Sequence, residues 1–128
     1  MNIVADASAL LSVILNEEDR GLVIEKTTGK SAIAPEVLPY EIGNALIAAR
    51  RKGRLSNNEA LEAFLISQRI EVRLLPVRIY DAMKVAISFG IYSYDAYYLQ
   101  CCLENRSPLI SFDVRMCEVA RKLGIEVV

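Results

Sequence analysis

The sequence contains no histidine and no tryptophan among its 128 residues. The lack of histidine excludes Ser-His-Asp hydrolysis, histidine acid–base cleavage of RNA and histidine zinc sites. Any catalysis must therefore use carboxylates, lysine, tyrosine, cysteine or a bound metal.

Cysteine is scarce, with only Cys101, Cys102 and Cys117 present. Their number is odd, they lack C-x-x-C spacing, and they lie among apolar residues with a helical pattern, so neither a disulfide framework nor a cysteine zinc site is expected. We predict reduced thiols packed in the core.

No charge of one sign is in excess, because 15 Lys and Arg stand against 16 Asp and Glu and give a net charge of -1. Without an overall basic field, any RNA binding must use local patches. The start has no basic segment, and Asp6 interrupts the apolar stretch from Ile3 to Leu15, so we expect neither a signal peptide nor a membrane span, and a cytoplasmic protein. The hydrophobic content of 53% favours apolar surface meant for a partner.

Short apolar runs alternate with helical patterns, and no linker or repeat divides the chain. Its length is typical of a single domain, so residues 1–128 are predicted to form one. Strands are expected at 2–5, 31–34, 71–75, 109–112 and 125–128. Four helices are expected at 7–15, 17–27, 78–88 and 113–123, and a fifth at 94–104 with a cap at Ser93. Two more are expected from Pro35 or Pro39 to the basic run before Gly53, and after a cap at Ser56. This alternation predicts an α/β domain with a mainly parallel sheet and helices on both faces.

Four acidic residues fall at the ends or starts of these elements. Asp6 follows the first strand and Asp113 follows the fourth, while Glu41 and Asp95 lie near the starts of two helices. In an open parallel sheet, ligands bind beyond the carboxyl ends of the strands, where neighbouring connections leave to opposite faces. If the first and fourth strands are adjacent, all four carboxylates can face one crevice.

Like charges gathered in one crevice need a divalent cation or a raised pKa. Oxygen ligands without histidine favour Mg²⁺ or Mn²⁺ over zinc. Such an ion would lower the pKa of a water molecule and neutralise a phosphate oxygen during in-line displacement. The pattern therefore favours metal-assisted phosphoryl chemistry.

Each acid also has a plainer interpretation. Asp6 and Asp113 are good N-cap residues, Asp95 suits the positive end of a helix dipole, and Glu41 suits a solvated helix position. Taken singly these interpretations stay open, and only the joint placement favours a site. Asp81 repeats the Tyr-Asp-Ala triplet of Asp95 on the preceding helix, and we predict that it is a surface acid.

Three polar residues accompany the acids. Ser8 and Ser111 stand beside Asp6 and Asp113, where their hydroxyls can order a carboxylate or a water molecule, or cap a helix. Asn44 lies three positions after Glu41 on the same helix face, within reach of the site or of a substrate backbone.

Four segments resemble the PIN-domain family, and within it the VapC-type toxins of bacterial and archaeal toxin–antitoxin pairs. Their order and spacing span nearly the whole chain. The segments are Val4-Ala5-Asp6-Ala7-Ser8-Ala9-Leu10, Glu41-Ile42-Gly43-Asn44-Ala45-Leu46, Tyr94-Asp95-Ala96-Tyr97-Tyr98-Leu99 and Leu109-Ile110-Ser111-Phe112-Asp113.

The resemblance implies a three-layer α/β/α fold with a five-stranded parallel sheet in the order 3-2-1-4-5. It also implies Mg²⁺- or Mn²⁺-dependent RNA cleavage by Asp6, Glu41, Asp95 and Asp113, with Asp6 and Asp95 as the direct metal ligands and with Ser8 and Ser111 at supporting polar positions. Two departures concern packing and substrate details. Ser111 stands where threonine is frequent, and the pairs Tyr97-Tyr98 and Cys101-Cys102 fill a helix that is often richer in alanine.

A VapC-like protein is further expected to form a homodimer and to bind an antitoxin whose tail blocks the site. The densest basic patch is Arg50, Arg51, Lys52 and Arg54, which can hold an RNA backbone or simply complement the end of its helix.

Other enzyme classes fit poorly. A haloacid-dehalogenase-type phosphatase needs a second aspartate at the position of Ser8, and a receiver needs a phosphoacceptor aspartate where Leu75-Pro76 stands. The stronger rival is a PIN-like module that binds RNA or protein without cutting, and the sequence leaves that alternative open.

Overall fold

Four parallel strands form the centre of the molecule, whose computed structural model describes all residues from 1 to 128. They are β1 (Asn2–Ala5), β2 (Ser31–Pro35), β3 (Arg73–Leu75) and β4 (Leu109–Ile110), in the order β3-β2-β1-β4. Val4 pairs with Ile33 on one side and with Leu109 on the other. The first and fourth strands are therefore adjacent, as the crevice requires.

The prediction of a fifth strand at residues 125–128 is wrong. Residues 125–128 form only an isolated parallel bridge between Val127 and Leu109, supported by hydrogen bonds from Leu109 N to Glu126 O (2.9 Å) and from Val128 N to Leu109 O (3.0 Å). Pro108 has no N–H to donate, and β4 is only two residues long. The edge of β4 thus offers too few backbone groups to pair a full strand.

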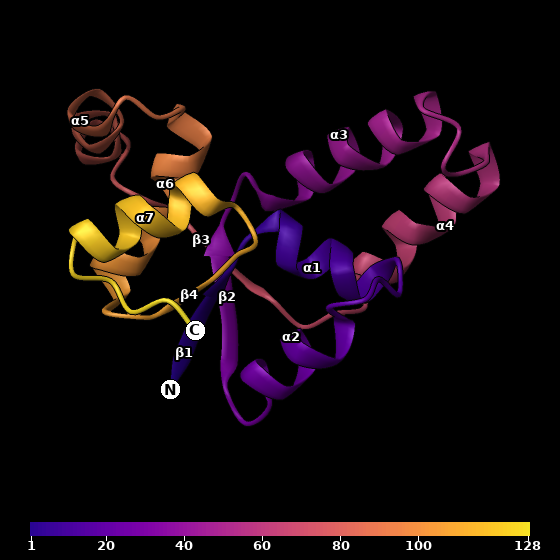
Figure 1. Cartoon of the computed structure of the whole chain (residues 1–128), viewed down its shortest axis with the longest axis horizontal. Helices are drawn as coiled ribbons and strands as arrows, with labels where there is room; N and C mark the ends of the chain where they lie inside the picture. The colour runs from indigo at the N-terminus through magenta and orange to yellow at the C-terminus, as the bar shows by residue number, and fades with distance from the viewer.

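Seven helices cover the sheet in two groups. They are α1 (Ala7–Ile14), α2 (Arg20–Thr27), α3 (Leu38–Arg51), α4 (Asn57–Ser67), α5 (Ile79–Phe89), α6 (Ser93–Asn105) and α7 (Val114–Lys122). Figure 1 shows the strands between α5, α6 and α7 on one side and α1 to α4 on the other, with α3 and α4 forming a hairpin that extends from the body. The three-layer α/β/α architecture is as predicted.

Helix boundaries follow local chemistry, with two differences from expectation. The predicted cap of α4 is a full capping box, because Glu59 N donates to Ser56 Oγ (3.1 Å) and Ser56 N donates to Glu59 Oε1 (2.8 Å). The second helix begins at Arg20 rather than at residue 17, because Asn16 with φ of 51° turns the chain after α1. The N-cap of α6 is Tyr92, so Ser93 is its first helical residue.

The core is built on the central strands. Ile3, Val4, Ile33 and Leu109 are fully buried because helices cover both faces of the sheet. The three cysteines are free and buried, and burial raises the pKa of the Cys101 thiol to about 11. Burial also raises the pKa of Cys102 and Cys117, and all three are free thiols in the interior, as predicted. No helix is both long enough and apolar enough to span a membrane.

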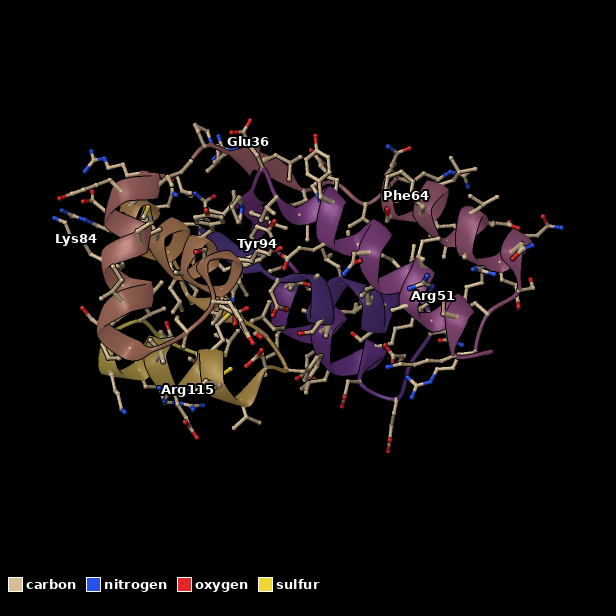
Figure 2. The ribbon with its side chains drawn as sticks, turned by 90° about the horizontal axis from the view of Figure 1, so that it is seen from above. Glu36, Arg51, Phe64, Lys84, Tyr94 and Arg115 are labelled. Carbon is tan, nitrogen blue, oxygen red and sulfur yellow. The ribbon has the colours of Figure 1, made fainter.

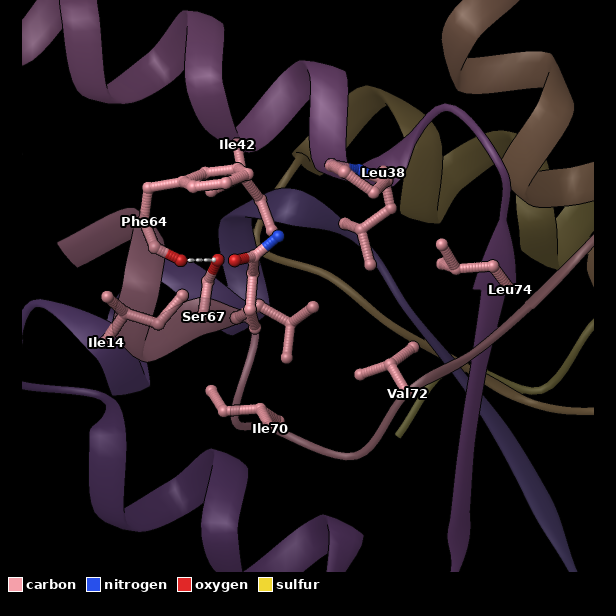
Figure 3. A pocket seen from close by; sticks show the side chains of 11 residues that line it. Ile14, Leu38, Ile42, Phe64, Ser67, Ile70, Val72 and Leu74 are labelled. Carbon is pink, nitrogen blue, oxygen red and sulfur yellow. Dashed lines mark hydrogen bonds between the residues drawn. The ribbon is translucent and has the colours of Figure 1, made fainter. Parts of the chain in front are cut away.

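An apolar hollow of about 230 Å³ lies where the end of α4 approaches α1 and α3 (Figure 3). Ile14, Leu38, Ile42 and Phe64 line it, and no titratable side chain does. The hollow is a packing feature of the α3–α4 side and not a site for acid–base or metal chemistry.

Candidate active site

Asp6 lies directly after β1, only 4% exposed, with its carboxylate held by three hydrogen bonds. Oδ1 accepts from Ala9 N (3.0 Å), which caps α1, and from Ser8 Oγ (2.7 Å), while Oδ2 accepts from Ser111 Oγ (2.5 Å). A carboxylate offers about four acceptor positions. Asp6 is therefore a helix cap with one acceptor position left unused by the protein.

Two serine hydroxyls connect Asp6 to the loop that follows β4. Ser111 Oγ accepts from Asp113 N (3.0 Å) and Ser8 Oγ accepts from Phe112 N (3.0 Å), while each hydroxyl donates to Asp6. Each serine hydroxyl thus accepts a hydrogen bond from one of two neighbouring backbone amides and donates one to Asp6. Together these bonds fix the Asp6 carboxylate relative to Asp113. The carboxyl ends of β1 and β4 are thereby linked through side chains as well as through the sheet.

All four candidate acids stand at helix N-termini. Asp6 and Asp113 are the N-caps of α1 and α7, and Asp113 Oδ1 accepts from Met116 N (2.9 Å). Glu41 and Asp95 lie in the first turns of α3 and α6. The positive end of each helix dipole favours a negative side chain, which offsets part of the repulsion among the acids.

The pKa values show that the four acids share one region. Burial raises the pKa of Asp95 to about 6, and the charges of Asp113, Glu41 and Asp6 add to that shift. Burial also raises the pKa of Asp6 and of Glu41, with contributions from the charge of Asp113 at Asp6 and of Asp6 at Glu41. Acids on segments far apart in the sequence therefore lie close enough for the charge of one to affect the pKa of another.

Asp81 stands apart from this group, as expected. It lies in the first turn of α5, where its Oδ1 is 3.7 Å from Lys84 Nζ. Its charge does not contribute to the raised pKa of Asp6, Glu41 or Asp95.

Tyr98 is a site residue that the sequence analysis treated only as packing bulk. Its ring is 1% exposed, and its hydroxyl and Glu41 Oε1 are the two buried side-chain atoms without a hydrogen-bond partner. Glu41 nevertheless contributes to the raised pKa of Tyr98, and Tyr98 acts to lower that of Glu41, so the groups are close neighbours outside ordinary hydrogen-bond geometry. The available signal was position, since Tyr98 lies three residues after Asp95 on one helix face.

An open hollow of about 600 Å³ has Glu41 in its lining, but none of the other three acids. Ser8, Glu41 and Asn44 line it together with Tyr40 and Tyr94. Asn44 thus faces the same space as Glu41, and Ser8, which also lines it, donates a hydrogen bond to Asp6 Oδ1.

The donor atoms suit a hard cation, although they do not form a closed cage. No group of three or more acidic or cysteine side chains is arranged to hold a metal ion. Mg²⁺ usually keeps several waters and takes only one or two carboxylates directly. The spare acceptor position on Asp6 and the unpartnered Glu41 Oε1 therefore fit a hydrated Mg²⁺ or Mn²⁺ better than a fully protein-ligated ion.

The basic patch lies away from the acids. Arg50 and Arg51 are in the last turn of α3, and Arg50 Nη1 donates to Asn57 Oδ1 (3.3 Å) across the hairpin. Glu41 is at the opposite end of this helix, and at about 1.5 Å per residue the separation is roughly 15 Å along the axis. Figure 2 likewise shows Arg51 on the hairpin and Tyr94 near the middle of the molecule.

The chain is similar to several solved structures. PAE2754 from Pyrobaculum aerophilum shares 22% identity with a TM-score of 0.68, over 93% of this chain and 84% of that one. VapBC2 from Rickettsia felis, bound to a DNA fragment from its promoter, shares 7% identity with a TM-score of 0.69, over 100% and 98% of the two chains. Mycobacterium tuberculosis VapC20, described as a sarcin-ricin loop cleaving toxin, shares 14% identity with a TM-score of 0.65, over 91% and 93%. At these identities the likeness shows the fold.

No curated protein matches the chain by sequence. A family model described as PIN domain does match, over residues 3–122. That range contains β2 to β4, all of β1 except its first residue, and all four acids. The chain therefore belongs to the PIN-domain family.

Proposed function

We propose that this protein is a Mg²⁺- or Mn²⁺-dependent ribonuclease that hydrolyses phosphodiester bonds in RNA. The observation that supports this most is the convergence of Asp6, Glu41, Asp95 and Asp113: the charges of Asp113, Glu41 and Asp6 all add to the raised pKa of Asp95, Asp113 adds to that of Asp6, and Asp6 adds to that of Glu41. Burial is the largest cause of these raised pKa values, and a bound cation would favour the charged form of each acid. Membership in the PIN-domain family agrees with nuclease chemistry.

We assign the acids separate roles. Asp6 and Asp95 bind the cation directly, Asp6 because three hydrogen bonds fix its orientation and Asp95 because burial and the charges of the other three acids disfavour its ionised form without a cation. Asp113 adds negative charge beyond the carboxyl end of β4, while Ser8 and Ser111 hold Asp6 in position. When bound, the cation would neutralise a phosphate oxygen and make the attacking water more acidic.

Glu41 is suited to accept a proton from the attacking water. Its pKa is raised by burial, and its Oε1 has no hydrogen-bond partner within the protein. A base works best when its pKa lies near the working pH. The nearby Tyr98 hydroxyl acts to lower the pKa of Glu41 and so counters part of the effect of burial on this base.

The cellular role that fits best is that of a toxin held in check by an antitoxin. Solved structures named VapBC2 and VapC20 share the fold. A groove of about 580 Å³ between α3 and α4 has an apolar lining that includes the exposed side chains of Ile47, Leu61 and Leu65. We propose that the antitoxin covers this apolar surface, that the protein forms a homodimer, and that it acts on RNA in the cytoplasm.

A non-cleaving PIN-like module that binds RNA or protein is the alternative. The observation that favours it is the absence of a preformed three-ligand metal cage. Only the nuclease predicts turnover of RNA that depends on an added cation.

Cleavage of RNA by the purified protein, free of any inhibitor, decides between them. We expect cleavage with Mg²⁺ or Mn²⁺, none with a chelator, and loss of turnover in Asp6→Asn and Asp95→Asn. Asp81→Asn is the matched control, because Asp81 occupies the same Tyr-Asp-Ala triplet outside the site. Cleavage that persists in chelator rejects the metal mechanism, and absence of cleavage with both ions favours the binding module.

The toxin role has its own test. Expression of the chain alone in bacteria should arrest growth, and Asp95→Asn should relieve the arrest at equal protein levels. If the wild-type chain does not affect growth although the purified protein cleaves RNA, the protein is a nuclease but not a toxin.

A further inference from the structure

The two edges of the sheet differ in what covers them. Beyond β4, the C-terminal segment adds a parallel bridge at Val127, and Figure 1 shows the C-terminus beside β4. β3 forms the other edge, and its main contacts are with β2 alone. No backbone hydrogen bond outside the sheet involves residues 71–77. The backbone groups of β3 that point away from β2 therefore have no partner in the protein.

The apolar hollow of about 230 Å³ lies on one face of this open edge. Ile70, Val72 and Leu74 line it, while the intervening Glu71 and Arg73 do not, which is the two-residue period of an extended chain. Figure 3 shows the three apolar side chains in a row along one wall of the hollow. Leu74 is still 40% exposed. The hollow is therefore open to solvent beside the strand.

The open edge also carries positive charge. Arg69 and Arg73 are exposed, outnumber the one acid between them, Glu71, and take part in no ion pair. Pairing of β3 with β3 of a second copy would bring the arginines of the two chains together, and like charges across a strand pair are unfavourable. The edge therefore suits an acidic partner better than a second copy.

We propose that β3 and the hollow bind an extended peptide segment of a partner protein, with an apolar side chain in the hollow and acidic residues beside Arg69 and Arg73. The segment adds a strand to the sheet, and its backbone pairs with the free groups of β3. None of the four candidate acids lines this hollow, so the inference does not depend on the proposed ribonuclease function.

The size of the hollow sets which side chain it takes. An apolar cavity of about 150 Å³ in a protein is large enough to bind benzene. The present hollow of about 230 Å³ therefore accommodates one leucine or phenylalanine side chain. Because side chains alternate along a strand, the neighbouring residues of the bound segment lie on the other face, which is the face that carries Arg73. The recognised pattern is thus an apolar residue with an acid on each side.

The probe for this site is a random linear peptide library displayed on phage and selected against the full chain. We expect the enriched peptides to share one large apolar residue flanked by Asp or Glu. A synthetic copy of the most enriched peptide is then methylated on alternate backbone nitrogens. Methylation in one phase should abolish binding, and methylation in the other phase should leave it unchanged, since only one edge of the peptide strand faces β3. Amide hydrogen exchange at residues 73–75 should slow in the complex.

Two substitutions test the named contacts. Ser67→Phe fills the hollow from the end of α4, and loss of the buried side chain, about 1.5 to 3 kcal/mol, should weaken peptide binding roughly 10- to 150-fold. Arg73→Glu should weaken it about fivefold, the change that corresponds to about 1 kcal/mol for one exposed ion pair. Arg73→Glu alters only the surface, so it keeps the test valid if Ser67→Phe does not fold.

Arg51→Glu is the matched control, because Arg51 is also exposed but lies at the end of α3 outside the hollow. It should bind the peptide like the wild type. Three results would overturn the docking site: a selection that enriches no peptide, wild-type affinity in both Ser67→Phe and Arg73→Glu, or equal loss of binding from methylation in either phase. A change of oligomeric mass in Arg73→Glu without a change in peptide affinity would assign the edge to a second copy instead. The measurements involve neither RNA nor metal, so their failure leaves the ribonuclease proposal unaffected.

Discussion

Ser111 and Asp6 are 105 positions apart in the sequence, yet Ser111 Oγ lies 2.5 Å from Asp6 Oδ2. Ser111 also accepts the backbone N–H of Asp113, so one hydroxyl holds two candidate catalytic residues in register. The adjacency of β1 and β4 makes this contact possible.

Replacing Ser111 with alanine should lower both stability and activity. The change removes the bond to Asp6 and leaves Asp113 N without its partner, which costs about 1 to 3 kcal/mol in the free energy of unfolding. Chemical denaturation measures the first effect and RNA cleavage the second. Ser107→Ala is the control, because Ser107 is also buried and hydrogen-bonded, to Asn105 O at 2.9 Å. If Ser107→Ala reduces cleavage as much as Ser111→Ala at matched folded fraction, the role given to Ser111 is wrong.

Tyr98→Phe should reduce cleavage without loss of stability. The variant removes a buried hydroxyl that has no hydrogen-bond partner, so the free energy of unfolding should stay equal or rise. It also removes the group that lowers the pKa of Glu41, so we expect roughly a tenfold loss of turnover at neutral pH, with the pH profile moved to higher pH. An unchanged pH profile would show that Tyr98 only fills space.

The metal-free protein should lose stability as pH rises from about 4 through about 6. An aspartate ionises near 3.8 in the unfolded chain, but the pKa of Asp95 is about 6 in the folded protein. Between these values the folded state binds more protons, so a rise in pH favours unfolding. Asp95→Asn removes this contribution and should melt higher than the wild type at pH 7 in chelator.

The measurement is thermal melting in chelator at several pH values, with Asp81→Asn as the control that should follow the wild type. Asp95 is partly exposed, so solvent screening makes the stability change smaller than the full pKa shift would give. Added Mn²⁺ should raise the melting temperature of the wild type at pH 7 much more than at pH 5. An Asp95→Asn variant that is less stable than the wild type at pH 7 in chelator contradicts the account.

The sequence predicted the architecture well because hydrophobic pattern and capping chemistry act locally. Buried runs such as Ile3-Val4-Ala5 gave the strands, and Ser56 with Glu59 gave the start of α4. The failure at residues 125–128 has a non-local cause. Whether an apolar run becomes a strand depends on the free edge that it meets, and β4 offers only two residues.

The site was predictable only in outline. The positions of Asp6 and Asp113 after strands predicted that they would meet, but each also proved to be a helix cap, so the two interpretations of these residues are compatible. Tyr98 and Glu41, whose buried oxygens lack hydrogen-bond partners, could not be foreseen as neighbours, because their proximity depends on where the sheet places the starts of α3 and α6. The hollow shared by Tyr40 and Tyr94 depends on the same placement.

Direct titration with Mn²⁺ tests the central claim, that carboxylates from distant segments jointly bind one hard cation. Calorimetry at pH 7 should show saturable binding by the wild type and by Asp81→Asn. Binding by Asp6→Asn and by Asp95→Asn should be at least about tenfold weaker, since even supporting groups around a metal are worth that much. Equal Mn²⁺ affinity in all four proteins, or no saturable binding by the wild type, would contradict the claim.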